Sequence, residues 1–280
     1  MGLQHRAQRY LKARGPAAFA AQIPRYLWRK AFDREDPLIH RRKMLGRQLH
    51  ETFGGEVQQG VFKGLKLGPE PTWARADLGP MLLGTYEINV VEQLRRLSEG
   101  RSTLVDIGAA DGYFGVGCVK AKLFERSVCF EADSITREAL METVLRNGVE
   151  DCVTIFGTAD SALLDKLASA NVDPGDAVFL IDIEGGEFTL LDDATLRSLA
   201  NAPFVVELHN EMLAGDDRLP ALVAAAERYF DISYVENGPR DPNANPLLRG
   251  FVENDRWLLC SEGRPAVRQR WMILEPKAKS

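Results

Sequence analysis

The sequence predicts an α/β protein with a doubly wound sheet of seven strands and helices on both faces. From residue 102 onward, short apolar runs alternate with longer amphipathic segments, which is typical of a mainly parallel sheet. A glycine turn, with Gly108 and Gly112, directly follows the first apolar run and precedes a predicted helix. Acidic residues end several of the runs, and ligands of such sheets bind at the carboxyl ends of the strands.

The elements follow from these patterns in order. We expect strands at 102–107, 127–132, 152–157, 177–183, 203–208, 231–236 and 256–261. We expect helices at 81–97, 113–124, 135–147, 160–170, 188–200 and 217–229. A polar loop rather than a helix separates the last two strands, which favours an antiparallel final strand.

Three regions are expected along the chain. Residues 1–50 are predicted to form a basic helical extension, and the glycine- and proline-rich stretch 51–80 to form a hairpin or an irregular β linker. The main domain then covers residues 81–280.

Composition indicates a folded chain of the cytoplasm. The protein has 280 residues, of which 45% are hydrophobic and 27% charged, so it can bury a full core. No apolar run approaches the roughly 18 residues of a membrane span, and no signal peptide is recognisable. The four cysteines lack paired spacing, and we interpret them as buried hydrophobes rather than zinc ligands or disulfides: Cys118, Cys129, Cys152 and Cys260.

Charge is unevenly distributed along the chain. Residues 1–47 hold twelve Lys and Arg against three Asp and Glu, so this segment carries +9 and the remainder −14. The acidic remainder argues against a nucleic-acid partner. In the basic segment, apolar residues recur at helical spacing: Phe19, Ile23, Tyr26 and Leu27. This pattern favours one of two arrangements. The segment is either a solvated helix packed on the body, or it makes a peripheral contact with the inner membrane face or with a complex.

The glycine turn favours a cationic ligand that contains a ribose. It lacks the G-x-G-x-x-G spacing, and Asp106 and Asp111 would repel a pyrophosphate. S-adenosyl-L-methionine (SAM) is the common ligand of the required kind. Glu131 ends the second predicted strand about 20 residues after the turn, where such folds hydrogen-bond a ribose diol.

Two neighbouring strand ends carry further proton-accepting groups. Asp182 and Glu184 are two residues apart near the end of the fourth strand, and a Gly-Gly turn brings Glu187 close. Glu207 and His209 repeat this spacing on the fifth strand. Such a cluster can bind a divalent ion, orient a polyol or supply a general base. We expect either His209 or Asp182 to be the general base. The alternative for His209 is a neutral histidine of the core. Whether the reaction needs a metal ion stays open.

Other segments are candidates for the rim of this site. Thr158, Ala159 and Asp160 follow the third strand and are expected beside the purine, although a helix-capping role explains Asp160 equally well. Residues 85–87 are expected to close over the methionine end of the cofactor or over the acceptor, the alternative being a helix start with a buried tyrosine. The loop at 238–246 is long enough for a lid.

Four motifs together resemble the FkbM family of SAM-dependent methyltransferases. They are Val105-Asp-Ile-Gly-Ala-Ala-Asp-Gly-Tyr-Phe, Phe130-Glu-Ala-Asp, Ile181-Asp-Ile-Glu-Gly-Gly-Glu and Val206-Glu-Leu-His. The Asp-x-Glu-Gly-x-Glu element is the most specific of them. The resemblance implies a Rossmann-like class I methyltransferase fold and O-methylation, often of sugars or polyketide-linked hydroxyls. Short pieces at 62–66 and 84–87 look like the subgroup associated with surface-polysaccharide synthesis.

The resemblance also implies which residues act. By match to the motifs, cofactor residues are Asp106, Gly108, Asp111 and Glu131, and active-site candidates are Asp182, Glu184, Glu187, Glu207 and His209. We expect the cofactor site to include as well Ala109, Gly112, Tyr113, Phe114, Ala132, Thr158, Ala159, Asp160, Asp182, Glu184, Thr85, Tyr86 and Glu87.

The leading expectation is therefore a SAM-dependent O-methyltransferase that acts on a sugar or glycan hydroxyl. RNA methylation is one alternative, because the basic segment permits it. A non-catalytic interaction module with the same fold is another. An NAD-dependent oxidoreductase is disfavoured because the phosphate-binding turn is missing.

Overall fold

The computed structural model describes residues 36–72, 76–209, 218–236, 238, 240–262 and 270–278. The chain divides into two units, residues 1–40 and 41–280, and helix α2 (Pro37–Phe53) runs across the boundary. Of the first unit only residues 36–40 are described, so the predicted apolar stripe at 19–27 lies outside the described residues. All that follows concerns the second unit.

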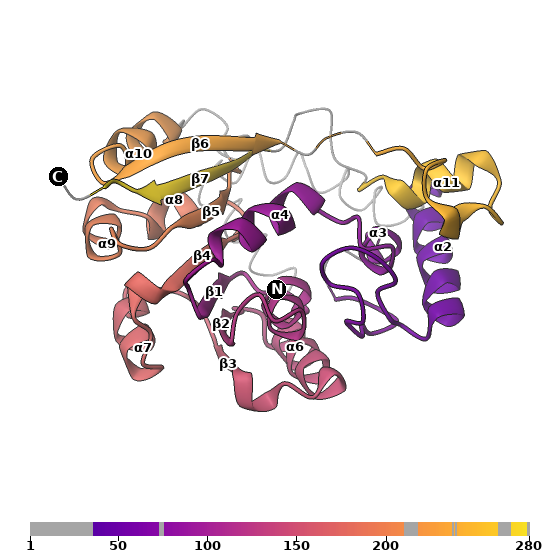
Figure 1. The fold of residues 1–280 in the computed structure, drawn as a ribbon, viewed down its shortest axis with the longest axis horizontal. Coiled ribbons are helices and arrows are strands. Elements are labelled where there is room, and N and C mark those ends of the chain that lie inside the picture. The colour runs from indigo at the N-terminus through magenta and orange to yellow at the C-terminus, as the bar shows by residue number, and fades with distance from the viewer. Residues whose placement is uncertain are drawn as a thin grey trace, which may run out of the picture. The chain divides into compact units, whose positions relative to one another are not determined.

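Within the described residues, seven strands form one sheet in the order β3-β2-β1-β4-β5-β7-β6 (Figure 1). The strands are β1 (Thr103–Ile107), β2 (Arg126–Phe130), β3 (Val153–Phe156), β4 (Ala177–Ile181), β5 (Phe204–Glu207), β6 (Phe230–Glu236) and β7 (Arg270–Pro276). The first five are parallel, and β7 pairs antiparallel with both β5 and β6. This is the strand order of the Rossmann-like methyltransferase fold, and the predicted fold class is confirmed.

Helices connect the strands and precede the sheet. They are α3 (Leu78–Leu82), α4 (Ile88–Leu97), α5 (Tyr113–Lys120), α6 (Ser134–Asn147), α7 (Leu163–Ser169), α8 (Glu187–Leu190), α9 (Asp193–Ser198), α10 (Leu219–Ala226) and α11 (Glu253–Cys260). Local sequence explains the clearest boundaries. Asp133 caps α6 by accepting from the amides of Ile135 and Thr136, and Gly148 ends the helix in a left-handed conformation. None of the described helices is long and apolar enough to cross a membrane.

The predicted strand at 256–261 is wrong, because residues 256–260 belong to helix α11 and the last strand is β7. A short apolar run such as Trp257 to Cys260 does not distinguish a strand from a helix. The burial pattern is helical, since Asp255, Leu259 and Cys260 are buried while Trp257 is 51% exposed. A helix therefore separates β6 from β7, where a polar loop was expected.

The predicted helix at 81–97 is interrupted. Gly84 and Glu87 have φ angles of 67° and 43°, so the chain leaves α3 and enters α4 through left-handed residues. A Cβ atom at position 84 would overlap the carbonyl oxygen of Gln59, so only glycine fits there. The predicted helix at 188–200 is divided as well, into α8 and α9, and Asp192 caps α9 by accepting from the amide of Thr195.

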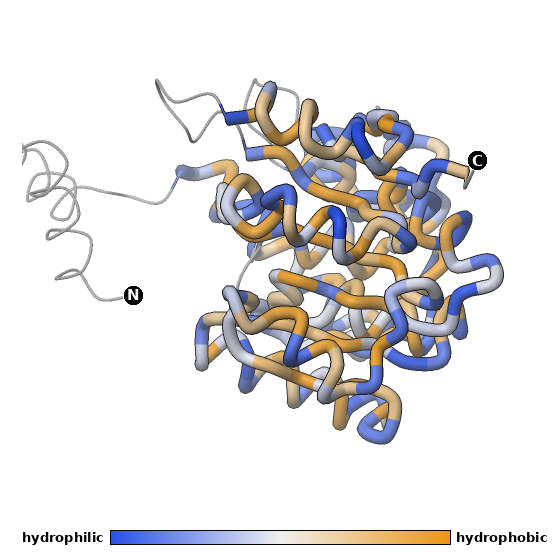
Figure 2. The backbone as a smooth tube through the Cα atoms, turned by 90° about the vertical axis from the view of Figure 1, so that its left-hand side faces the viewer, coloured by the Kyte–Doolittle hydropathy of each residue, from blue (hydrophilic) through white to orange (hydrophobic). Residues whose placement is uncertain are grey.

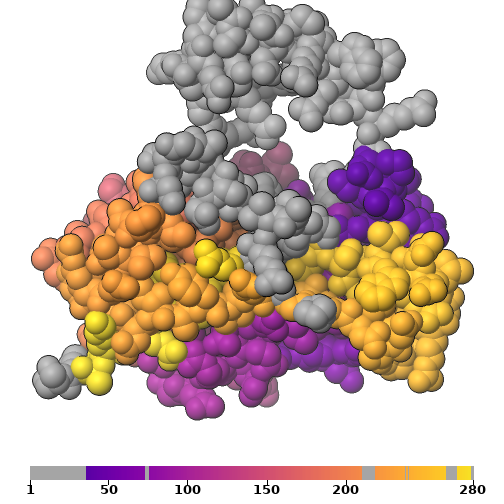
Figure 3. All heavy atoms as spheres, turned by 90° about the horizontal axis from the view of Figure 1, so that it is seen from above, coloured from indigo at the N-terminus to yellow at the C-terminus, as the bar shows by residue number. Residues whose placement is uncertain are grey.

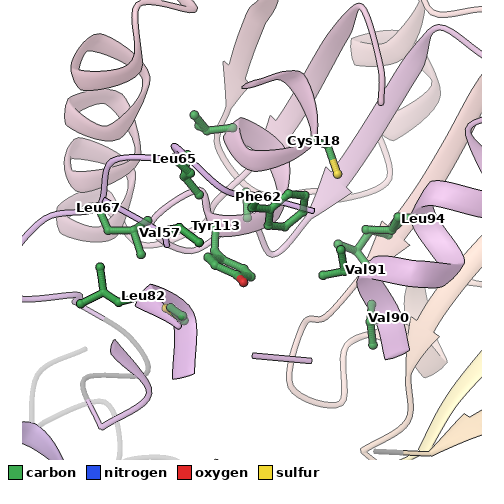
Figure 4. Packing of buried hydrophobic residues seen from close by; sticks show 14 of the residues in the cluster. Val57, Phe62, Leu65, Leu67, Leu82, Val90, Val91, Leu94, Tyr113 and Cys118 are labelled. Carbon is green, nitrogen blue, oxygen red and sulfur yellow. The ribbon is translucent and has the colours of Figure 1, made fainter. Parts of the chain in front are cut away.

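Apolar side chains pack on both faces of the sheet. Figure 2 shows long orange stretches of the tube in the described part of the chain, and β1 and β4 are buried along their whole length. On one face, residues of the 51–80 stretch join the core, and Figure 4 shows Phe62 next to Tyr113, with Val57 and Leu65 nearby. The rings of Phe62 and Tyr113 meet edge to face at 5.1 Å. In Figure 3, orange and yellow atoms of the chain after β5 lie on the face seen from above.

Two further sequence features can be compared with the structure. Glu56 and Lys66 form an antiparallel bridge within the 51–80 stretch. The four cysteines are free thiols; Cys118, Cys129 and Cys260 are buried and Cys152 is half-buried.

Candidate active site

His209 lies among four carboxylates where the carboxyl ends of β4 and β5 meet. Its Nε2 atom lies 3.6 Å from Glu207 Oε1, 3.7 Å from Asp182 Oδ1 and 3.8 Å from Glu184 Oε2. Its Nδ1 atom lies 3.3 Å from Glu187 Oε1. The imidazole is only 5% exposed. The structure thus brings together all five residues that the sequence placed at these two strand ends.

The backbone around β4 explains this convergence. β4 and β5 are parallel, with Ile181 opposite Val206, so the residues that follow each strand emerge at the same edge. Glu184 and Gly185 then adopt φ angles of 53° and 92°, which turn the chain back toward the sheet. As a result Glu187, at the start of α8, returns to the cluster.

Glu187 ties the two strand ends together. One carboxylate oxygen accepts a hydrogen bond of 2.8 Å from the Gly185 amide, and the other accepts one of 2.8 Å from the His209 amide. Glu187 is fully buried, and backbone amide donors compensate a buried carboxylate for its lost hydration.

The carboxylates set the protonation of His209. Burial lowers the pKa of the imidazole, but the contact with Glu187 and the charges of Asp182, Glu187 and Glu184 outweigh burial. The pKa of His209 therefore lies above its ordinary value of 6.5.

The glycine turn joins this cluster to the end of β1. Gly108 and Gly112 have φ angles of 92° and 90°, and Ala110 between them is also left-handed. A Cβ atom at position 108 would overlap the carbonyl oxygen of Asp182, so glycine is required for the ends of β1 and β4 to come so close. The amides of Gly108 and Ala109 both donate to the carbonyl oxygen of Phe130 in β2.

Glu131 lies at the end of β2, beside this turn. Its Oε2 atom accepts from the Ala110 amide at 3.0 Å, and its Oε1 atom accepts from the Asp133 amide at 2.8 Å. Each carboxylate oxygen has a second lone pair, so the group retains capacity to accept from a diol. The guanidinium of Arg137 donates to the carbonyl oxygens of Glu131 and Ala132.

Asp106 is buried below the glycine turn and does not line its open side. It is 2% exposed, and its Oδ2 atom lies 2.9 Å from where a Cβ on Gly115 of α5 would sit. Burial raises the pKa of Asp106 to about 7; a backbone hydrogen bond from Gly115 opposes this shift, and the charges of Asp182 and Glu131 add to it.

Asp111 is held by a residue far away in the sequence. Its carboxylate accepts from the Thr72 amide at 2.8 Å and also from the Thr72 hydroxyl. The two residues are separated by 39 positions, and no local pattern links them. Thr72 could therefore not be predicted from the sequence as a neighbour of the turn.

Asp160 lies in the segment after β3 and is not the N-cap of α7, a position that Ala162 occupies without a side-chain cap hydrogen bond. Its carboxylate accepts from the Ala162 amide at 3.0 Å and from Lys166 Nζ at 2.8 Å. The hydrogen bond from Lys166, followed by that from Ala162, lowers the pKa of Asp160. Lys166 also donates to the carbonyl oxygen of Thr158, next to Ala159. This lysine fixes the loop where the purine is expected.

Residues 85–87 lie beside the first turn of α5. The Tyr86 ring packs edge to face on Tyr113 at 5.4 Å and lies 6.4 Å from the ring of Phe114. The Thr85 hydroxyl donates to the carbonyl oxygen of Pro80 at 3.3 Å. Tyr86 is half-buried, so this packing is compatible with either predicted role of the segment.

Glu87 is buried and connects to the chain beyond α11. Its amide donates to Glu262 Oε1 at 2.8 Å, and Glu262 forms an ion pair with Arg240 of the polar loop. Glu262 was not predicted, because it is 175 positions away and follows a segment that was taken for a strand.

Known proteins resemble this chain in structure but not detectably in sequence. No protein-family profile matches the chain, and no curated protein matches it in sequence. Similar solved structures include the B. subtilis m1A22 tRNA methyltransferase TrmK, at 7% identity and a TM-score of 0.42 over 66% of this chain and 64% of that one. This chain thus covers less than two thirds of TrmK.

Two further structures show comparable similarity. A candidate O-methyltransferase from Klebsiella pneumoniae has 13% identity and a TM-score of 0.45, over 91% of this chain and 96% of that one. A candidate tRNA (m1A22) methyltransferase from Streptococcus pneumoniae, in complex with S-adenosyl-L-methionine, has 14% identity and a TM-score of 0.44, over 69% and 74%. Similarity this distant carries no argument about ligand or substrate, and the fold assignment rests on the strand order.

Proposed function

We propose that this protein is a SAM-dependent O-methyltransferase of the FkbM family that acts on a hydroxyl of a sugar or glycan. The observation that carries the proposal is the cluster of His209 and four carboxylates beside the glycine turn of a methyltransferase-type sheet. It places proton-accepting groups where such sheets bind their ligands.

The residues around the turn suit SAM. Glu131 retains lone pairs for a ribose diol, and the carboxylates of Asp182 and Glu184 favour a cationic ligand over a pyrophosphate. When bound, SAM supplies a methyl group on a positively charged sulfur. Glu131 would hold the ribose, and residues 108–114 would form the wall beside the methionine part. Residues 158–160 would line the purine end.

The chain's own residues then position the acceptor and take its proton. A sugar presents several hydroxyl groups, and carboxylates such as those of Asp182 and Glu207 accept hydrogen bonds from them. His209 or Asp182 accepts the proton of the hydroxyl that is methylated; the two side chains lie 3.7 Å apart and can reach the same oxygen. Positioning provides most of the acceleration, and the base contributes roughly 10²- to 10⁴-fold.

A glycan acceptor suits the charge of the site better than RNA does. Four carboxylates at the cluster repel a phosphate backbone, and residues 48–280 carry a net charge of −14. The basic segment 1–47 keeps RNA as the second candidate, because its charge of +9 would attract phosphates. A gel-shift titration at several salt concentrations separates the two, since an RNA enzyme should shift RNA with strong salt dependence.

The basic segment also suggests where the enzyme works. We propose a cytoplasmic protein whose residues 1–47 contact the inner membrane face or a synthesis complex peripherally. Sedimentation with vesicles tests the membrane contact. Pelleting with anionic but not neutral vesicles would support it, and no lipid-dependent pelleting would contradict it.

The acceptor is identified by comparing cells with and without this protein. Mass spectrometry of their polysaccharides and glycolipids should show one species that lacks a methyl group, a difference of about 14 Da for CH₂ by elementary composition, in the cells without the protein. Identical methylation in all fractions would contradict a glycan acceptor.

A further inference from the structure

We infer that Asp182, Glu207 and His209 form a binding site for a divalent transition-metal cation. One ligand atom from each residue lies within 4.8 Å of the others. Metal–ligand bonds of about 2.1 Å place adjacent ligand atoms about 3 Å apart and opposite ones about 4.2 Å apart. The observed separations of 3.6 and 3.7 Å from His209 Nε2 fall between these limits, so small side-chain movements would complete the site.

The Nε2 atom of the buried imidazole is aimed into the cluster. Nε2 faces three carboxylate oxygens, at 3.6 Å for Glu207, 3.7 Å for Asp182 and 3.8 Å for Glu184, and all three separations exceed a normal hydrogen bond. Buried ring nitrogens are usually hydrogen-bonded or coordinated to a metal. A cation between Nε2 and the carboxylate oxygens of Asp182 and Glu207 would lie within reach of one ligand atom from each of the three residues.

The other ring nitrogen shows the support typical of a metal-bound histidine. Such a histidine almost always donates its second N–H to a carboxylate, carbonyl or water. Here Nδ1 lies 3.3 Å from Glu187 Oε1, and the two backbone amides that bond Glu187 fix this carboxylate in place. Glu187 therefore orients the ring so that Nε2 faces Asp182 and Glu207.

The donor set indicates the class of ion. One imidazole with two carboxylates suits Mn²⁺, Fe²⁺ or Zn²⁺ better than Mg²⁺ or Ca²⁺, which prefer oxygen ligands alone. Even with a protonated histidine, the five residues of the cluster retain excess negative charge, which a divalent cation would reduce. Three protein ligands leave positions open for hydroxyl oxygens.

The role of the ion rests on the proposed function. An ion at this position would hold adjacent hydroxyls of the acceptor and lower the pKa of the one that is methylated. His209 is then a ligand rather than the base. The hydroxyl proton passes to the carboxylate oxygen of Asp182 that does not bind the ion, and because this side chain is 32% exposed the proton can reach water.

The test is titration of the EDTA-treated full chain with Mn²⁺. Binding is measured as the loss of the free Mn²⁺ signal in electron paramagnetic resonance. We expect one Mn²⁺ per chain. The H209A, D182N and E207Q variants should each bind at least tenfold more weakly, and the exposed α6 variant E138Q should bind as the wild type does. Circular dichroism checks the fold of each variant, and D182N alters the most exposed of the three ligands.

Absence of stoichiometric binding at millimolar Mn²⁺, or unchanged binding in all folded variants, would overturn the site. The outcome is separate from that of the proposed function. Binding of Mn²⁺ without any methyl transfer would contradict the proposed function alone. Methyl transfer that is insensitive to EDTA, in a chain that binds no Mn²⁺, would contradict the metal site alone.

Discussion

Each oxygen of Glu187 accepts one backbone N–H, and these two bonds hold together the chain segments that follow β4 and β5. The same carboxylate faces Nδ1 of His209. A buried group with this many contacts is costly to remove, because its partners would lose their hydrogen bonds. Glu187 is therefore better understood as a positioning residue than as a base.

Asp182 and His209 should affect turnover more than cofactor affinity. D182A and H209A are each expected to lower kcat by roughly 10²-fold or more, because they remove the groups that receive the acceptor and its proton. The SAM dissociation constant should change only a few-fold. Turnover assays with a methylated-product readout and calorimetry provide the two values, and unchanged turnover in both variants would contradict the assigned roles.

Asp106 should make the fold less stable as pH rises. Its folded-state pKa is raised from 3.8 to about 7, so the folded state binds the proton more tightly than the unfolded state does. Its stabilising contribution is complete below pH 3.8 and is lost as pH rises through 7, on the order of 2–3 kcal/mol between pH 5 and 7.

The D106N variant tests this contribution, because the amide stays neutral at every pH. Urea unfolding at pH 5 and pH 8 should show a smaller loss of stability for D106N than for the wild type. An equal loss in both proteins would show that Asp106 is ionised in the folded state already at pH 5.

At the scale of elements, the meeting of β1 and β4 depends on Gly108. We expect G108A to destabilise the protein by roughly 3 kcal/mol or more, because the new Cβ meets the Asp182 carbonyl and φ is 92°. G100A is the matched control, since Gly100 also has a positive φ but open space around it, and it should cost only about 1–2 kcal/mol. If G108A and G100A lose the same amount of stability in thermal unfolding, the ends of β1 and β4 can separate freely.

Strands with strong local patterns could be predicted from the sequence. β1 and β4 are mainly apolar, with Asp106 near the end of β1 and Asp182 directly after β4, and both strands lie within one to two residues of the expected bounds. α11 could not be predicted, because its apolar run is as short as a strand and its helical burial comes from packing against distant residues. β7 was missed for the related reason that the expected last strand had been placed too early.

In the candidate site, too, residues with a local sequence pattern were predictable and residues placed by long-range contacts were not. Asp182, Glu184, Glu207 and His209 were identifiable because spacing by two residues and strand order bring them to one edge of the sheet. Thr72, which holds Asp111, reaches the site through long-range folding that no local pattern encodes.

At the scale of the whole molecule, charge and topology agree on the kind of ligand. The carboxyl ends of β1, β2, β4 and β5 gather acidic groups, which favour a cationic cofactor and a polyhydroxylated acceptor over phosphates. The excess of basic over acidic residues lies before residue 48, away in sequence from the strands that form the site. The proposed donor site and acceptor site share one edge of the sheet, and Gly108 lies where they meet.

Calorimetric titration with SAM tests the central claim most directly. The wild-type chain should bind one SAM, and E131Q should bind at least tenfold more weakly because the ribose loses a carboxylate acceptor. E125Q is the matched control, since Glu125 is an exposed acid at the opposite end of β2, and it should bind as the wild type does. No measurable binding by the wild type at millimolar SAM would contradict the account.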